Sequence, residues 1–145
     1  MNLYTIGFTG KSARDFFESL REVEARYLLD VRLRNDSQLA SFTKKGNIEF
    51  LTQELTSLTY RDLPILAPKE EMFKQYRTDK DWARYEQKYI QLLRERDVTS
   101  EIDRSHFDGG AVLLCSEPKP ERCHRRLAAE YLRDELFEEA CIIHI

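Results

Sequence analysis

Two patterns of apolar residues, short continuous runs and helical spacing, alternate along this chain. Short apolar runs, which predict buried strands, occupy residues 2–6, 26–31, 109–115 and 141–145. Apolar positions at helical spacing predict helices over residues 12–23, 47–58, 81–96 and 120–136. Strands that alternate with helices are typical of an α/β domain with a mainly parallel sheet.

The pattern indicates one domain over residues 1–145. No internal repeat, low-complexity stretch or flexible linker interrupts it, and 145 residues suffice for a hydrophobic core without disulfides. We expect a three-layer arrangement, Rossmann-like or flavodoxin-like, with helices on both faces of the sheet. Pro64 and Pro68 break the pattern in the middle, so residues 60–72 are predicted to form a short strand followed by irregular chain.

Composition narrows the class of protein. Hydrophobic residues make up 41% and charged residues 34%, as in a globular protein with a well-charged surface. The net charge of −3 argues against coating nucleic acid through bulk charge, although it leaves room for a local basic patch. No apolar run approaches about 18 residues and no leader pattern is present, so we expect neither membrane insertion nor export. Three cysteines, an odd number, favour free thiols in a reducing compartment, and we predict a cytoplasmic protein.

Residues 7–12, Gly-Phe-Thr-Gly-Lys-Ser, look at first like a nucleotide-binding phosphate loop. A Walker A loop places four residues between its first glycine and the Gly-Lys pair, whereas only two separate Gly7 from Gly10. The loop is therefore too short to enclose a triphosphate. A glycine-rich turn before a helix still offers backbone N–H groups to an anion. The alternative is a tight turn that ends in Ser12 as a helix cap.

Most of the candidate chemistry lies between Cys115 and Arg125. Cys115 ends the clearest predicted strand, at the edge where open α/β sheets bind ligands. Cys123, His124 and Arg125 fall in the first turns of the next predicted helix, which Pro120 is suited to begin. His124 lies on the helix face that packs toward the sheet. A thiol, an imidazole and a guanidinium would then converge near a helix N-terminus, surroundings that lower a cysteine pKa and bind anions.

Three interpretations of this cluster stand. In the first, Cys115 or Cys123 is a catalytic thiolate and His124 is its base or positioning group. In the second, the three residues bind a metal; we disfavour it because adjacent Cys-His ligands fit poorly on one helical turn and no CxxC pair is present. In the third, Cys115 is a core residue and His124 a satisfied buried histidine. The combined polarity of Glu117, Cys123, His124 and Arg125 favours a functional site, for which we predict no metal and no cofactor.

Asp30 and Arg32 end a neighbouring strand and should face the same crevice. The pair is either a structural salt bridge or an arginine held ready for a carboxylate or phosphate, and Arg34 adds a donor. Elsewhere we expect Cys141 in the core and His144 in packing rather than in catalysis.

Five segments resemble the DUF488 family, a domain of unknown function, in order and spacing: TIGFTGKS, LLDVRLRNDSQLASFTKK, LAPKEE, DWARYEQKY and LLCSEPKPERCHRRLAAEYL. The resemblance covers nearly the whole chain and is to the branch with DVRL-x-N-x-SQLA-x-F after the second strand. Leu66-Ala67-Pro68 stands where another branch has Leu-Gly-Gly. The resemblance implies a compact cytoplasmic α/β domain. It also implies shared motif residues at Gly7, Asp30, Arg32, Cys115, Glu117, Cys123, His124 and Arg125.

The leading hypothesis is a small enzyme, or a relic of one, that binds an anionic small molecule such as a nucleotide or a phosphate-bearing metabolite. The predicted catalytic residues are Cys115, Cys123 and His124. The predicted anion-binding residues are Gly7, Thr9, Asp30, Arg32, Glu117 and Arg125, with Glu117 holding an arginine in place. The alternative is a non-catalytic module that binds nucleic acid or a protein partner through a basic patch of Arg32, Arg34, Lys44, Lys45 and the arginines of residues 122–126.

Overall fold

The computed structural model describes residues 1–36 and 40–145. Residues 37–39, which belong to the SQLA motif of the sequence, lie outside the described residues. Within the described ranges, no helix combines the length and the apolar character that crossing a bilayer requires.

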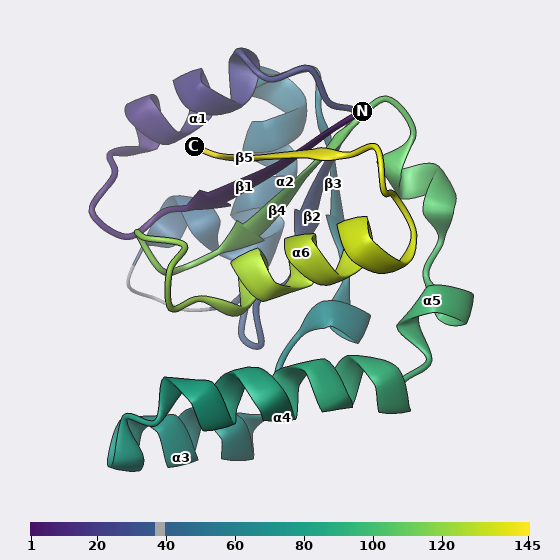
Figure 1. Cartoon of the computed structure of the whole chain (residues 1–145). Coiled ribbons are helices and arrows are strands. Elements are labelled where there is room, and N and C mark those ends of the chain that lie inside the picture. Colours follow the sequence, from purple (N-terminus) through teal and green to yellow (C-terminus); the bar gives the residue numbers. More distant parts are fainter. Residues whose placement is uncertain (37–39) are drawn as a thin grey trace.

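The strands of the described ranges form one parallel sheet in the order β3-β2-β4-β1-β5 (Figure 1). Their bounds are β1 Asn2–Gly7, β2 Tyr27–Asp30, β3 Thr59–Asp62, β4 Ala111–Cys115 and β5 Cys141–His144. In the register of the sheet, Gly7 pairs with Cys115 and Asp30 pairs with Leu114. The carboxyl ends of β1, β2 and β4 therefore meet at one edge of the sheet.

Helices cover both faces of this sheet, which confirms the predicted three-layer α/β class. On one face α1 (Ala13–Arg21) and α2 (Lys45–Leu55) contribute Phe16, Phe17, Leu20 and Ile48 to a core. On the other face α4 (Trp82–Glu95) and α6 (His124–Glu135) build a second core. The remaining described elements are α3 (Glu70–Asp79), which packs alongside α4, α5 (Val98–Glu101), and 3-10 turns at Ser41–Thr43, Pro64–Leu66 and Arg104–Phe107.

The chain reverses its direction across the sheet after β3. It first steps from β1 to β2 and β3 with α1 and α2 on one face. It then returns through α3–α5 to β4, and through α6 to β5, on the other face (Figure 1). The connections that follow the neighbouring strands β2 and β4 thus run in opposite directions along the sheet. Open α/β sheets bind ligands in the crevice at such a topological switch point. The order differs from the common Rossmann and flavodoxin orders because β1 lies between β4 and β5.

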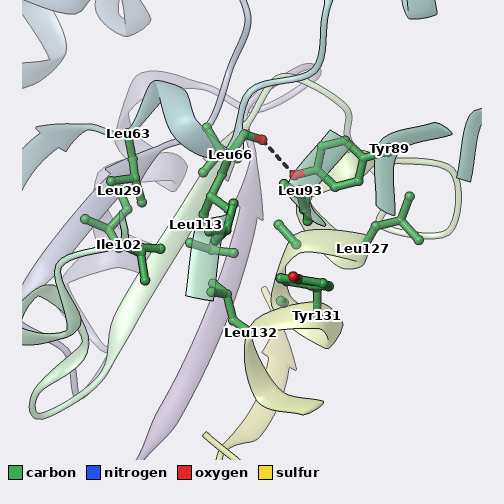
Figure 2. Close-up of a cluster of buried hydrophobic side chains, with 14 of the residues drawn as sticks. Leu29, Leu63, Leu66, Tyr89, Leu93, Ile102, Leu113, Leu127, Tyr131 and Leu132 are labelled. Carbon is green, nitrogen blue, oxygen red and sulfur yellow. Dashed lines mark hydrogen bonds between the residues drawn. The ribbon is translucent and has the colours of Figure 1, made fainter. Parts of the chain in front are cut away.

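Figure 2 shows the core between the sheet, α4 and α6. Tyr89 and Leu93 of α4 are fully buried there, as are Leu113 of β4 and Leu132 of α6. The Tyr89 hydroxyl donates a hydrogen bond to the Leu66 carbonyl over 2.7 Å. A buried hydroxyl needs such a partner. The bond ties the segment that leads into α3 to the side of α4, and so fixes the position of one wall of the site described below.

Two helix predictions need correction: the start of α6, and α3, which was not predicted. All other predicted strands and helices are observed, with ends within three residues of their predicted positions. The helix predicted over 120–136 begins only at His124, because Cys123 has an extended backbone (φ −136°, ψ 139°) and caps the helix. Pro120 therefore lies in the preceding turn. The sequence does not predict α3, which begins immediately after Lys69 with two glutamates in its first turn, a favourable position in the field of the helix dipole.

Cys141 is exposed, so the prediction that it lies in the core is wrong. The reason is the place of β5, which is an edge strand with no fully buried residue. His144 on the same strand is also exposed, although its Nδ1 makes a 2.6 Å hydrogen bond with the Thr5 hydroxyl.

Candidate functional site

A cleft of about 1120 Å³ opens at the switch point. One wall follows the carboxyl ends of β1, β2 and β4, and includes Thr9, Arg32 and Cys115. The opposite wall comes from α3 and the start of α4, including Tyr76 and Trp82. Cys123 and His124 lie at the cleft together with Cys115, and each of the three is no more than 3% exposed. The sulfurs and the imidazole therefore form the floor of a large, open site.

The charge of the cleft is opposite to that of the chain. The chain carries a net charge of −3. The cleft is nevertheless lined by six cationic side chains and two acidic ones: Lys11, Arg32, Arg34, Arg77, Lys80 and Arg122 against Glu70 and Glu117. A concave surface of one sign concentrates ligands of the opposite sign.

The aromatic residues of the cleft are the part of the site that sequence reasoning missed. Trp82 stacks on Tyr85 with ring centroids 5.0 Å apart and planes at 16°, and Tyr76 packs against both rings. Phe73 completes this wall. One sequence signal could have revealed this wall: Phe73, Tyr76 and Arg77 have i, i+3, i+4 spacing. If residues 70–79 are taken as a helix, this spacing places the three side chains on one helix face.

The N-terminus of α6 brings two adjacent residues into the floor from different backbone conformations. Cys123 is extended, and its sulfur accepts a 3.5 Å hydrogen bond from the Arg125 backbone N–H as the helix cap. His124 is the first helical residue, and its ring is 2% exposed. The objection that adjacent Cys and His side chains diverge on a helical turn therefore fails, since only one of them is in the helix.

His124 is held in one tautomer by the neighbouring strand end. Its Nε2 lies 2.6 Å from the Val31 carbonyl oxygen, which can only accept a hydrogen bond. Nε2 therefore carries a proton, and in the neutral ring Nδ1 is the acceptor. Burial lowers the pKa of His124, but Cys115 and the Val31 carbonyl together raise it by more. The ring is thus prepared to take a proton at Nδ1.

The Cys115 sulfur lies 3.7 Å from Nδ1 and 3.9 Å from Nε2 of His124. The sulfur is thus close to both ring nitrogens, of which only Nδ1 is free, because Nε2 is bonded to the Val31 carbonyl. A hydrogen bond from Cys123 lowers the pKa of the Cys115 thiol well below its usual range; burial opposes this shift, and His124 adds to it. The same bond, together with burial, raises the pKa of Cys123. Cys115 is therefore the more acidic thiol of the pair.

Tyr85 adds a hydroxyl group beside the sulfurs. Burial, and then the neighbouring Cys115 and Cys123, raise the pKa of its phenol, so the group stays protonated. Its oxygen has no hydrogen-bond partner among the described residues. A buried phenol without a partner is a donor available to a ligand in the cleft.

Asp30 and Arg32 form a buried, bidentate salt bridge. The Nε and Nη2 atoms of Arg32 each donate to an Asp30 carboxylate oxygen over 2.8 Å, and Nη2 also donates to the Thr43 carbonyl over 2.7 Å. Tyr60 donates its hydroxyl to the same carboxylate. The remaining nitrogen, Nη1 of Arg32, is buried without a partner in the described part of the chain. The pair is thus structural, and Arg32 retains one spare donor at the cleft.

Arg125 and Gly7 belong to a second cluster, and neither of these two residues lines the cleft. Arg125 is 0% exposed and donates from Nε to the Thr5 hydroxyl over 3.2 Å and from Nη1 to the Glu117 carbonyl. A Cβ on Gly7 would lie 1.6 Å from that carbonyl oxygen, so only glycine fits. We call Thr5, Gly7, Glu117, Arg125 and His144 the anchor cluster. It ties the loop after β4 to the end of β1.

The predicted site residues thus divide into two groups. Cys115, Cys123, His124, Arg32 and Thr9 line the cleft, whereas Gly7, Arg125 and the buried Asp30 support it from behind. Glu117 does hold an arginine, but through its backbone carbonyl rather than its carboxylate, which is exposed at the cleft. Lys11 of the 7–12 loop, which we expected to point outwards, also lines the cleft, and burial and then Arg125 lower its pKa.

The three floor residues also satisfy the distance requirement of a metal site. One donor atom from each of Cys115, Cys123 and His124 lies within 4.8 Å of the others. This is the one group of three or more His, Cys, Asp or Glu side chains in the described ranges that meets the requirement.

The fold and the floor together define an α/β protein with a cysteine–histidine centre at the carboxyl ends of its strands. The family described as Domain of unknown function DUF488 matches residues 12–132, and the chain belongs to that family. No curated protein and no solved structure matches the chain.

Proposed function

We propose that this protein is a small enzyme that binds a phosphate-bearing, nucleotide-like anion in the cleft and acts on it at Cys115. The single observation that carries the proposal is a thiol–imidazole pair at the floor of a cleft whose charge is opposite to that of the chain. A reactive side-chain pair in a concave, charged site is the usual arrangement of an active site.

The anion-binding part of the proposal rests on the cations of the rim. Arg77 and Lys80 lie on the helical wall and Arg122 on the opposite side, all three exposed and lining the cleft. Arg32 adds its spare Nη1 from below. The neighbouring aromatic rings offer a stacking surface to a planar group, and the volume of about 1120 Å³ gives a nucleotide ample room. A ligand with both a phosphate and a ring uses both kinds of side chain.

The chemical part of the proposal uses Cys115 as the nucleophile. Its sulfur forms a bond to an electrophilic centre of the substrate while His124 holds the thiol proton at Nδ1. The bond between that centre and its leaving group breaks, and the leaving group takes the proton from Nδ1. Tyr85 and Arg32 donate hydrogen bonds to charge that develops on the substrate.

The chain contains one tryptophan, Trp82, and it lines the cleft, so its fluorescence reports occupancy directly. We expect saturable quenching by nucleoside phosphates. An Arg77→Ala/Lys80→Ala double variant should bind them at least about tenfold more weakly, since each charge-assisted hydrogen bond contributes roughly 1.5–3 kcal/mol. Lys88→Ala is the matched control, because it removes an exposed charge from α4 outside the cleft and should bind normally. Equal losses in both variants, or no saturable quenching by any nucleotide, sugar phosphate or inorganic phosphate, would overturn the anion-binding proposal.

A second experiment tests the thiol after treatment with a chelator. We expect the negatively charged reagent iodoacetate to alkylate Cys115 faster, relative to neutral iodoacetamide, than it alkylates exposed Cys141. His124→Gln should slow alkylation of Cys115 and leave that of Cys141 unchanged. If Cys115 is inert to both reagents while the protein is folded, it is not the nucleophile.

The alternative, a nucleic-acid-binding module, has less support. Several residues of the proposed basic patch are paired with acids: Arg34 with Glu70, Lys45 with Asp62, and Arg126 with Glu130. Single-stranded oligonucleotides belong in the Trp82 titration as a separate arm. Binding that is tighter for oligonucleotides than for mononucleotides, and that weakens steeply with salt, would favour this alternative.

A further inference from the structure

We propose that Cys115, Cys123 and His124 form a three-ligand site for a soft divalent metal ion, with Zn²⁺ as the expected occupant and the remaining coordination position open to the cleft. Two thiolates and one imidazole are a ligand set that zinc accepts, and sites with three protein ligands and one open position are typical of catalytic zinc. The inference does not depend on anion binding by the cleft, and in the metal-bound protein it replaces the nucleophilic step proposed for Cys115.

The spacing of the donor atoms fits tetrahedral coordination. With zinc–sulfur and zinc–nitrogen bonds of about 2.3 and 2.0 Å, the sulfur and nitrogen ligands of a tetrahedral ion lie about 3.5 Å apart. The Cys115 sulfur lies 3.7 Å from Nδ1 of His124, and all three donors lie within 4.8 Å of one another. Only small side-chain rotations separate this arrangement from a closed site.

The outer contacts of His124 match those of a metal ligand. A histidine that binds metal through one ring nitrogen almost always donates the other N–H to a carboxylate, a carbonyl or water. Here Nε2 donates to the Val31 carbonyl over 2.6 Å, which leaves the Nδ1 lone pair free, 3.7 Å from the Cys115 sulfur. The backbone of β2 thus orients the ring.

Charge also favours zinc at this buried position. Each of the three side chains is no more than 3% exposed, so an isolated charge there is costly. Zn²⁺ with two thiolates and a neutral imidazole is formally uncharged. Binding displaces the thiol protons of Cys115 and Cys123 to solvent, and no bond other than sulfur–proton breaks.

The open side of the site faces groups that suit a metal-bound ligand. All three residues line the cleft, so a fourth ligand enters from there. Tyr85, whose buried hydroxyl has no partner among the described residues, lines the same cleft beside the sulfurs. It can donate a hydrogen bond to an oxygen bound at the fourth position. Metal binding and attack by the Cys115 sulfur exclude each other, because a coordinated thiolate is not free to attack.

Cobalt(II) is the first probe, because tetrahedral cobalt with thiolate ligands has intense visible bands and a sulfur-to-metal charge-transfer band. We expect one equivalent to bind the full-length, metal-free protein with these bands, and Zn²⁺ to displace it. Cys115→Ser and Cys123→Ser should each weaken binding at least about tenfold and remove charge-transfer intensity. Cys141→Ser, which removes the exposed cysteine, should bind as the parent does. Unchanged bands in both floor variants, or loss of the bands in Cys141→Ser, would overturn the proposal.

A second measurement needs no variant and so does not depend on whether a variant folds. Mass spectrometry after alkylation, with and without one equivalent of Zn²⁺, should show that the ion protects Cys115 and Cys123 but not Cys141. Equal alkylation of all three cysteines with and without zinc would refute the site. Nucleotide quenching of Trp82 is measured separately, so failure of the metal site is distinguishable from failure of the anion-binding proposal.

Discussion

Arg32 and Arg125, two buried arginines at the same edge of the sheet, have different surroundings, and we infer that they have different functions. Arg32 is held by the Asp30 carboxylate, lines the cleft and keeps one nitrogen without a partner. Arg125 is held by the Thr5 hydroxyl and the Glu117 carbonyl, both uncharged, and does not line the cleft. Its Nη2 also has no partner among the described residues, so the counter-charge and the position at the cleft separate the two arginines, not the unpaired nitrogen. Both follow strands that end at the switch point. Residue type and sequence position therefore did not distinguish an arginine of the cleft from one of the anchor cluster.

The comparison shows what separates the two roles. An acid beside a buried arginine compensates its charge and fixes its plane, so that the guanidinium can point a spare N–H at a ligand. Neutral acceptors leave the charge of an arginine uncompensated, but they can tie two backbone segments together. Arg125 thus supports the loop after β4 from behind the cleft.

Gly7→Ala should be the most damaging change. Its Cβ would lie 1.6 Å from the Glu117 carbonyl oxygen and 2.7 Å from Nη1 of Arg125, so the loop after β4 must move. We expect the free energy of unfolding to fall by about 5 kcal/mol or more, the top of the range for single substitutions. Chemical denaturation measures it.

Gly46→Ala is the matched control for that experiment. A Cβ at Gly46 would meet no atom within 4 Å, and the residue lies in α2. Alanine should stabilise the helix by roughly 0.5–1 kcal/mol. A Gly7→Ala protein as stable as its parent would show that the anchor cluster is not packed as described.

Arg32→Met should cost about 3 kcal/mol of unfolding free energy, because it leaves the buried Asp30 carboxylate without its counter-charge. Denaturation melts measure this loss, and Trp82 titration should show nucleotide affinity at least about tenfold lower, since the spare donor is gone. Adding Asp30→Asn should restore part of the stability but none of the affinity. Recovery of both would mean that Arg32 acts only through folding.

Arg125→Met should cost less, about 1–2 kcal/mol, because it removes hydrogen bonds but leaves no buried anion behind. The measurement is again denaturation. Nucleotide affinity of the folded variant should stay within about threefold of the parent, since Arg125 lies outside the cleft. A loss of affinity as large as that of Arg32→Met, at retained folding, would erase the distinction between the two arginines.

His144→Ala should have the smallest effect, about 0.5 kcal/mol. Its ring is exposed, and Thr5 keeps Arg125 as a partner when the imidazole is removed. Thermal melts should show a shift of a few degrees at most, with alkylation of Cys115 unchanged. A large loss of stability would place His144 among the residues on which the anchor cluster depends.

Sequence patterns predicted the α/β class and most of the elements because strands β1, β2 and β4 are nearly continuous apolar runs. They also predicted that His124 faces inward and that Cys115 ends a buried strand. They did not predict α3, where charged residues outnumber the few apolar ones that pack on α4. They misplaced Cys141, since an edge strand and a central strand have the same short apolar pattern.

Sequence patterns could not predict which site residues line the cleft and which support it from behind, for a physical reason. Arg125 is turned away from the cleft by its bonds to the Thr5 hydroxyl and the Glu117 carbonyl, partners from other parts of the chain. The start of α6 at His124 is set by the extended backbone of Cys123. Local propensity does not decide such a boundary; the capping sulfur and the packing around it do.

The strand order also determines when each strand can pair while the chain is being synthesised on the ribosome. β1 is made first, yet its neighbours in the sheet are β4 and β5, which begin at Ala111 and Cys141. Until those segments follow, β1 is an apolar strand with both edges unpaired, the kind of segment that sticks to other chains. Pairing across so many residues is slow. Newly made chains should therefore close their sheet late, and depend on chaperones or dilution until β4 arrives.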